Sequence, residues 1–212
     1  MFQGLRFSAR NNQLGKLQSM NILHIDSSIL GDNSASRLLS RELVSRLRAD
    51  NPGAEVKYLD LAADSLPHLT GGSLAQADPG EAARDARAIS DLLGADVIVI
   101  GAPMYNFGIP SQLKAWIDRI VVKGKTFRYT QSGPEGLVKG KRVFVAVARG
   151  SVYAPGSPAE FAESYLRHVF GFIGISDVTF VRAEGLGLSP EHRAKSLDTA
   201  VATIHTSIRA AA

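Results

Sequence analysis

The serines that follow the first apolar run are the first side chains with the type and spacing to bind a ligand. Ser27 and Ser28 come directly after that run, and Ser34, Ala35 and Ser36 stand where a helical pattern begins. Hydroxyls and the free N–H groups of a helix N-terminus can bind an anion, and the helix dipole favours a phosphate there. Plain N-capping would use only one of these serines, so the additional hydroxyls favour a phosphate site.

A second candidate stretch follows the β-branched run from Val97 to Ile100, which is typical of a strand buried on both faces of a parallel sheet. After it, Met104, Tyr105, Asn106 and Phe107 lie between Pro103 and Pro110. A flat aromatic ligand could lie along such a loop without meeting a charged side chain. We expect Gly101 and Gly108 at positions where a Cβ would block a backbone conformation or a close approach. A loop that only connects a strand to a helix is the alternative.

Other kinds of site lack their sequence signatures. No Gly-Lys-Ser/Thr ending is present for a nucleoside triphosphate, and no Gly-x-Gly-x-x-Gly follows the first predicted strand. The absence of cysteine excludes thiolate zinc sites and cysteine nucleophiles, and the five histidines show no ligand spacing. Gly-x-Ser-x-Gly is also absent, so a hydrolase triad has no support. We therefore expect no metal site.

The composition is that of one soluble domain. The chain has 212 residues, of which 45% are hydrophobic and 21% charged, and no apolar run approaches the length of a membrane helix. We expect no association with membranes. The lack of cysteine suits the reducing cytoplasm, which is the predicted location.

The formal charge of +4 is concentrated at the N-terminus. Arg6, Arg10 and Lys16 fall within the first 19 residues, which hold no acidic residue, so the rest of the chain is close to neutral. This distribution argues against nucleic acid as a partner. Residues 1–19 show no periodicity and precede a second methionine, Met20. We predict that they are an extension outside the fold, from an upstream start or added sequence, with a targeting peptide as the alternative. The domain then spans 20–212.

Strand and helix patterns alternate five times along the domain. Strands are predicted at 21–25, 56–61, 96–100, 142–148 and 177–182. Helices are predicted at 34–51, 81–93 and 158–172, and two more begin at Ser111, as a cap, and at Pro190. The segments 62–80 and 123–140 are expected to be irregular. Such alternation predicts an α/β, flavodoxin-like, doubly wound parallel sheet of five strands in the order 2-1-3-4-5. Ligands bind such sheets between strands one and three, and both candidate loops end there.

Longer motifs in this order resemble one family. They are Ser-Ser-Ile-Leu with Ser-x-Ser after strand one, Ala-Pro-Met-Tyr-Asn-Phe-Gly-Ile-Pro-Ser-Gln-Leu-Lys after strand three, Thr-Phe-Arg-Tyr-Thr and Gly-Pro-Glu-Gly-Leu before strand four, and Phe-Gly-Phe-Ile-Gly-Ile later. Together they resemble the bacterial FMN-dependent NADH azoreductase and quinone reductase family, from Met20 to the C-terminus.

The resemblance implies bound FMN, NADH as electron donor, and quinones or aromatic azo compounds as acceptors. It assigns the FMN phosphate to Ser28, Ser34, Ala35 and Ser36. It assigns one side of the isoalloxazine to Met104, Tyr105, Asn106 and Phe107, and the other edge of that ring to Ala148, Arg149, Gly150 and Ser151. The substrate pocket is assigned to Tyr129 and Phe172. The cofactor performs the chemistry, so no catalytic side chain is expected. The sequence departs from the family at Ala148, where a hydroxyl is expected, and at Ser151, where a glycine is expected.

Two further expectations concern kinetics and assembly. Because the loop from Pro103 to Pro110 should cover one face of the flavin, donor and acceptor would share the other face in a two-electron, ping-pong reaction. Aromatic segments at 127–129 and 170–172, which one crevice could not bury alone, predict a homodimer. The alternatives are a flavodoxin-type FMN electron carrier, an NADPH-dependent FMN reductase, and a nucleotide-binding regulatory module. Carriers of this type would more plausibly be acidic.

Overall fold

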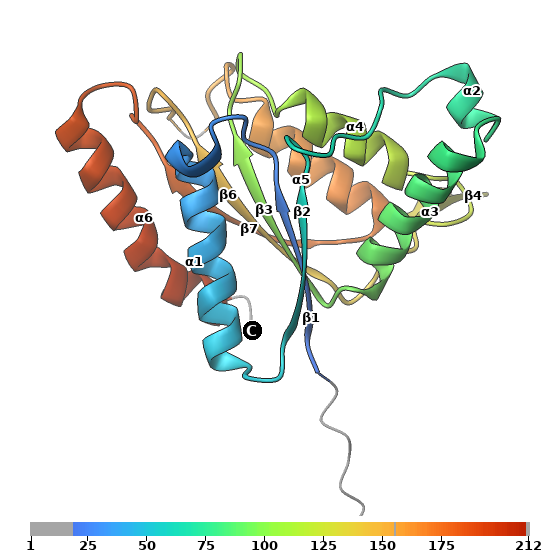
Figure 1. Cartoon of the computed structure of the whole chain (residues 1–212), viewed down its shortest axis with the longest axis horizontal. Helices are drawn as coiled ribbons and strands as arrows, with labels where there is room; N and C mark the ends of the chain where they lie inside the picture. The colour runs from blue at the N-terminus through green and yellow to red at the C-terminus, as the bar shows by residue number, and fades with distance from the viewer. Residues whose placement is uncertain (1–18, 155, 211–212) are drawn as a thin grey trace, which may run out of the picture.

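A parallel sheet forms the centre of the molecule, as the computed structural model shows for residues 19–154 and 156–210 (Figure 1). The strands of this sheet are β1 (Asn21–Asp26), β2 (Glu55–Asp60), β3 (Val97–Pro103), β6 (Arg142–Ala148) and β7 (Asp177–Ala183). They are ordered β2-β1-β3-β6-β7, which is the order 2-1-3-4-5 when only these strands are counted. The predicted fold and strand order are confirmed. Most of the predicted N-terminal extension, 1–18, lies outside the described residues.

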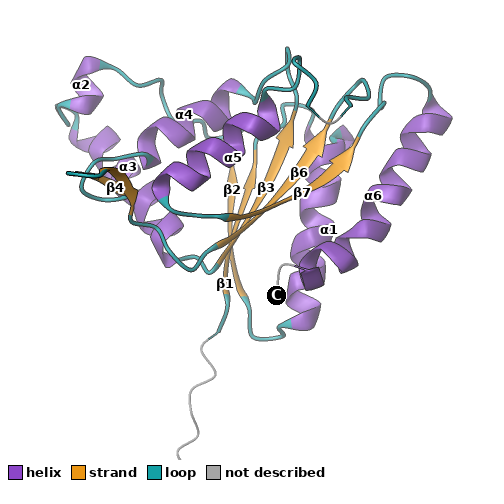
Figure 2. Ribbon diagram, turned by 180° about the vertical axis from the view of Figure 1, so that it is seen from behind, coloured by secondary structure: helices purple, strands orange, loops and turns teal. Residues whose placement is uncertain are grey.

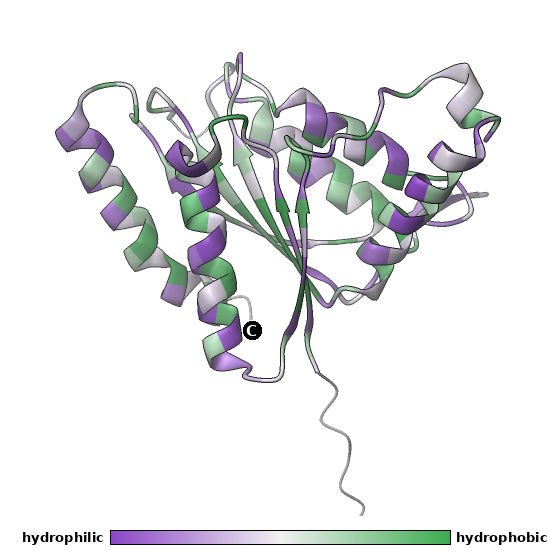
Figure 3. Cartoon of the chain, in the orientation of Figure 1, coloured by the Kyte–Doolittle hydropathy of each residue, from purple (hydrophilic) through white to green (hydrophobic). Residues whose placement is uncertain are grey.

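Helices cover both faces of the sheet (Figures 1 and 2). One face carries α1 (Ala35–Asp50) and α6 (Pro190–Ala210); the other carries α3 (Pro79–Gly94), α4 (Ser111–Ile120) and α5 (Ala162–Ile173), with the short α2 (Gly71–Leu74) beside α3. Figure 3 shows hydrophobic strands between helices that alternate hydrophobic and hydrophilic residues. The core accordingly consists of two clusters, one on each face. Trp116 is in one of them, as predicted. No helix in the described part of the chain is long and apolar enough to cross a membrane.

The segment 123–140 differs from the prediction that it is irregular. It forms an antiparallel hairpin of β4 (Phe127–Thr130) and β5 (Gly133–Gly136). A Cβ on Gly136 would overlap the backbone of Ile173 and Gly174 at the end of α5. The hairpin is therefore held by a tertiary contact that requires glycine. Local Gly and Pro signals could not show that contact.

Three smaller predictions are also wrong. The loop 62–80 contains α2, and α5 begins at Ala162 rather than at 158. Ser111 is the first residue of α4 and does not cap it, because Pro110 occupies the N-cap position and no side-chain bond caps the helix.

The carboxyl ends of the strands lie together at the upper edge of the sheet in Figure 1. β3 is longer there than predicted, since its last three residues pair with Ala146, Val147 and Ala148 of β6. The loops after β1, β3 and β6 consequently begin side by side. This edge is where the predicted binding loops meet.

Candidate functional site

The start of α1 forms a phosphate cradle, a name we use for Ser28, Ser34, Ala35 and Ser36. Ser34 is the N-cap residue: its Oγ accepts from the N–H of Arg37 at 3.3 Å and lies 3.1 Å from Ser36 Oγ. The N–H groups of Ala35 and Ser36, both buried residues, have no acceptor among the described residues. Two orphaned N–H groups, several hydroxyls and a helix dipole match the donors that a phosphate needs, so the cradle fits such a group.

The first loop is tied directly to the end of β3. Ser27 donates to the carbonyl oxygen of Gly101 from its N–H at 3.2 Å and from its hydroxyl at 2.7 Å. A Cβ on Gly101 would overlap the Asp26 carboxylate and would lie 3.2 Å from the carbonyl oxygen of Ser36. The expected close approach at Gly101 is therefore confirmed. The same expectation for Gly108 is wrong, because the nearest atom to an added Cβ would be 4.0 Å away.

The loop after β3 ends in a tight turn. Tyr105 and Gly108 exchange two backbone hydrogen bonds of 3.0 Å, and the two residues between them have positive φ, 48° at Asn106 and 69° at Phe107. This is the geometry of a type I′ turn. It exposes the Phe107 side chain, of which 54% is accessible to solvent. The positive φ angles of this loop thus fall on an asparagine and a phenylalanine and not on Gly101 or Gly108.

Tyr105 joins this turn to the cradle. Its hydroxyl lies 3.3 Å from Ser28 Oγ and accepts from the N–H of Ile29, also at 3.3 Å. The two loops that the sequence predicted to flank one crevice therefore touch each other.

The third predicted loop lies next to them. The carbonyl oxygen of Ala148 accepts from the N–H of Met104 at 2.8 Å. Gly150 and Ser151 are exposed, and their own N–H groups donate no hydrogen bond within the described residues. These two N–H groups are free for a polar ligand edge. No hydroxyl stands at Ala148 to add to them.

The side chain of Arg149 is buried among three glutamates. It is 3% exposed, and its guanidinium donates to Glu184 at 3.0 Å, to Glu160 at 3.2 Å and to Glu163. The guanidinium is therefore used inside the protein, where it fixes the loop that follows β6.

Tyr129 and Phe172 are not brought to these loops within one chain. They belong to an aromatic cluster in which Phe127 lies 5.5 Å from Tyr129 and 4.7 Å from Phe172, between ring centroids. Figures 1 and 2 both show β4 far from the upper ends of β1 and β3. Tyr129 is 63% exposed, so this cluster presents an aromatic surface.

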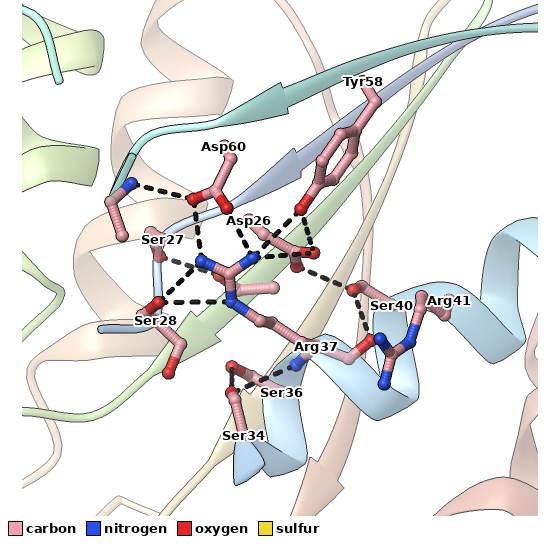
Figure 4. Close-up of polar contacts among 12 residues, drawn as sticks. Asp26, Ser27, Ser28, Ser34, Ser36, Arg37, Ser40, Arg41, Tyr58 and Asp60 are labelled. Atoms are coloured by element: carbon pink, nitrogen blue, oxygen red, sulfur yellow. Dashed lines mark hydrogen bonds and ion pairs between the residues drawn. The ribbon is translucent and has the colours of Figure 1, made fainter. Parts of the chain in front are cut away.

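A polar network behind the cradle was not predicted (Figure 4). Arg37, which is 8% exposed, donates from two nitrogens to the carbonyl oxygen of Ser28 at 3.2 and 2.8 Å. It also makes a bidentate pair with Asp60, with two bonds of 2.7 Å, and donates to the Tyr58 hydroxyl at 3.0 Å. Arg37 thus joins the cradle to the end of β2. The available sequence signals were an arginine directly after Ser36 and an acidic residue near the end of the second predicted strand.

The network changes the ionisation of its members. The hydrogen bond from Arg37 lowers the pKa of Asp60 below its usual range. Burial, reinforced by the negative charge of Asp26, raises the pKa of Tyr58 to about 12. Tyr58 therefore keeps its proton at neutral pH and donates it to Asp26 Oδ2 at 3.2 Å.

The lowered pKa of Asp60 predicts a pH-dependent contribution to stability. Because the folded state holds the carboxylate ionised, this contribution is present above the unfolded pKa of about 4 and is lost as the pH falls through the lower folded pKa. We expect Asp60→Asn to lower the free energy of unfolding by about 2 kcal/mol at pH 7. Below about pH 4, the difference from the unmodified protein should shrink. Urea unfolding between pH 7 and pH 3 measures both.

Asp64→Asn is the matched control, because the Asp64 side chain is 87% exposed and its ion pair with Arg84 lies at the surface. It should change stability little at any pH. A deficit of Asp60→Asn that stayed constant down to pH 3 would contradict the role of the ion pair.

The cradle predicts a second outcome. Replacing both Ser34 and Ser36 with alanine should weaken FMN binding by about 1–3 kcal/mol, the scale of hydrogen bonds to a charged group. Loss of the Ser34 cap should also lower stability by about 1 kcal/mol. Fluorescence titration with FMN and urea unfolding without it separate the two effects. Thr70→Ala, which removes the cap of α2, controls for capping alone. Unchanged FMN affinity in the double variant would refute the assignment.

Comparisons with known proteins identify the family of the chain. The profile of the family described as flavodoxin-like fold matches residues 20–208. A relative from Xanthomonas euvesicatoria, named FMN-dependent NADH:quinone oxidoreductase 1, is 57% identical over 183 residues, which cover 86% of this chain and 94% of the relative. A relative of the same activity name from Rhizobium meliloti is 54% identical over 196 residues, covering 87% and 95%.

Solved structures show the same architecture. An azoreductase from Bacillus anthracis superposes with a TM-score of 0.79 at 26% identity, covering 88% of this chain and 97% of that one. A second structure from that organism, an FMN-dependent NADH-azoreductase in complex with FMN, gives a TM-score of 0.81 at 24% identity and covers 91% and 100%. The chain belongs to the flavodoxin-like family that includes the FMN-dependent NADH:quinone oxidoreductases.

Proposed function

We propose that this chain is an FMN-dependent NADH:quinone oxidoreductase that also cleaves aromatic azo compounds to amines. The observation that carries the proposal is the contact between the phosphate cradle and the Tyr105–Gly108 turn, through the Tyr105 hydroxyl, at the carboxyl ends of β1 and β3. The names of the relatives at 57% and 54% identity support it. When bound, FMN would supply the redox chemistry, taking a hydride from NADH and giving two electrons to the acceptor.

The residues of the chain bind and orient the cofactor. The cradle holds the phosphate, and Met104, Tyr105, Asn106 and Phe107 hold the ring with apolar surface and one amide. The free N–H groups of Gly150 and Ser151 stabilise negative charge at the other edge of the ring. The side chain of Arg149 acts indirectly, by fixing the loop that carries these N–H groups.

Steady-state kinetics test the activity. With one ring face covered by the turn, NADH must leave before the quinone binds, so we expect parallel double-reciprocal lines when NADH is varied at several benzoquinone concentrations. Intersecting lines would show that donor and acceptor bind together and would contradict the shared face.

A yellow protein that does not oxidise NADH with benzoquinone would instead be a flavodoxin-type carrier. A colourless protein that does not bind FMN would favour the regulatory module. A strong preference for NADPH would favour the FMN reductase.

We also propose a homodimer of the domain 20–212 in the cytoplasm. β4, which carries Tyr129, lies far from the upper ends of β1 and β3 (Figure 2), and Phe172 belongs to the same aromatic cluster through Phe127. The two residues can therefore border a substrate pocket at the flavin only if a second copy supplies them. The exposure of Tyr129 and Phe107, 63% and 54%, supports an aromatic contact between copies. Light scattering at micromolar concentration should give the mass of two chains. A monomer with full activity would exclude this pocket.

A further inference from the structure

Arg193, in the first turn of α6, contacts the residue that precedes the phosphate cradle. Its Nη2 donates to the carbonyl oxygen of Asn33 at 3.1 Å, although the two residues are 160 positions apart. Asn33 directly precedes Ser34, the cap of α1. The arginine therefore contacts the peptide unit that leads into the cradle.

The start of α6 is fixed in place by several contacts. Ser189 caps the helix, with its Oγ accepting from the N–H of His192 at 3.1 Å. Gly185 has a φ of 67°, and a Cβ there would overlap the His192 ring, so the loop before α6 packs tightly on its first turn. In the same loop, Gly187 donates to the carbonyl oxygen of Gly150 at 2.9 Å. The loop that leads into α6 thus contacts both the first turn of that helix and the loop that carries Gly150.

The charges around the cradle distinguish Arg193 from its neighbours. Arg37 is neutralised by its bidentate pair with Asp60, and Arg41 lies 3.5 Å from Asp32. None of the ion pairs within 4.0 Å among the described residues includes Arg193, which is partly buried. Its hydrogen bond to a carbonyl leaves the full positive charge in place. A positive charge next to a dianion in a partly buried site acts strongly, because solvent screens it only in part.

We infer that Arg193 is a positioning residue for the cofactor phosphate. Arg193 supplies a positive charge beside the cradle that no carboxylate of the described chain pairs with, and it holds the Asn33 peptide in place. This inference rests on the proposed binding of FMN. It predicts that Arg193 discriminates FMN from riboflavin, which carries the same ring without a phosphate.

Fluorescence titrations of the apoprotein with FMN and with riboflavin test the inference. We expect Arg193→Ala to raise the Kd of FMN about five- to tenfold at low ionic strength and to leave the Kd of riboflavin unchanged. The effect on FMN should shrink in about 0.5 M salt, where the screening length is only a few ångströms. Arg193→Lys should restore part of the affinity, since it keeps the charge. Lys195→Ala, which removes an exposed charge one half-turn further on, should have no such effect.

Each other outcome has a definite meaning. Equal weakening of FMN and riboflavin would show that Arg193 only stabilises the loop, and would overturn the inference. Equal effects of Lys195→Ala and Arg193→Ala, or no effect of Arg193→Ala, would also overturn it. Failure of the unmodified protein to bind FMN would overturn the proposed function itself.

Discussion

Arg149→Met should lower the free energy of unfolding by about 3–5 kcal/mol, the scale for removing one partner of a buried ion cluster. The substitution leaves Glu160, Glu163 and Glu184 close together, with side chains only 14%, 13% and 24% exposed. Only Arg182 would remain as a positive partner, through Glu163. Urea unfolding of both proteins at pH 7 measures the difference.

Arg182→Met is the control for this prediction. Arg182 pairs with the same Glu163, but its side chain is 45% exposed, so its loss should change stability by less than about 1 kcal/mol. Similar losses in the two variants would show that the burial of Arg149 does not determine its contribution.

Gly101→Ala should lower stability by about 3 kcal/mol, at the upper end of the usual range for overpacking a core. The added Cβ would overlap the Asp26 carboxylate and would lie 3.2 Å from the Ser36 carbonyl oxygen and 3.3 Å from Ser40 Oγ. Relief of the overlap requires the Asp26 carboxylate to move, which disturbs its hydrogen bond with Ser40 of α1. The tight contacts with Ser36 and Ser40 also push the first turns of α1, and with them the cradle, away from β3. FMN affinity should therefore fall together with stability. Unfolding without FMN and fluorescence titration with it test both parts.

Gly53→Ala provides the matched substitution, because an added Cβ there meets no atom within 4 Å and the backbone is not left-handed. It should be neutral or slightly stabilising. A well-folded Gly101→Ala protein with normal FMN affinity would mean that the close approach of α1 and β3 is not needed.

Local sequence was sufficient for most of the sheet. The β-branched run that begins at Val97 is typical of a buried strand, and Pro52 with Gly53 is typical of the end of a helix. The end of β3 was not predictable in this way, because its last residues are strand only through pairing with Ala146–Ala148. The β4–β5 hairpin was missed for the same reason, since the contact of Gly136 with Gly174 joins distant segments.

The residues of the site also divide into those that local sequence reveals and those that only tertiary packing brings together. The serines and the Met-Tyr-Asn-Phe loop were visible because their chemistry is carried by consecutive residues. The contacts of Arg37 with Asp60 and of Arg193 with Asn33 depend on how α1 and α6 lie against the sheet, which no local pattern specifies. Tyr129 and Phe172 remain predictions, because their proposed role requires a second copy.

Helix α1 contributes both to the cradle and to the hydrophobic core, and this has a consequence for the lifetime of the protein. Its first turn lies in the cradle, while Leu39, Leu43 and Leu47 further along lie in the core. A cofactor that binds only the folded chain therefore adds to the stability of that core by mass action, by about 2.7 kcal/mol at a free concentration one hundred times Kd. Cells short of flavin would then hold more unfolded chain for proteases to remove, so the abundance of the protein would follow the flavin supply.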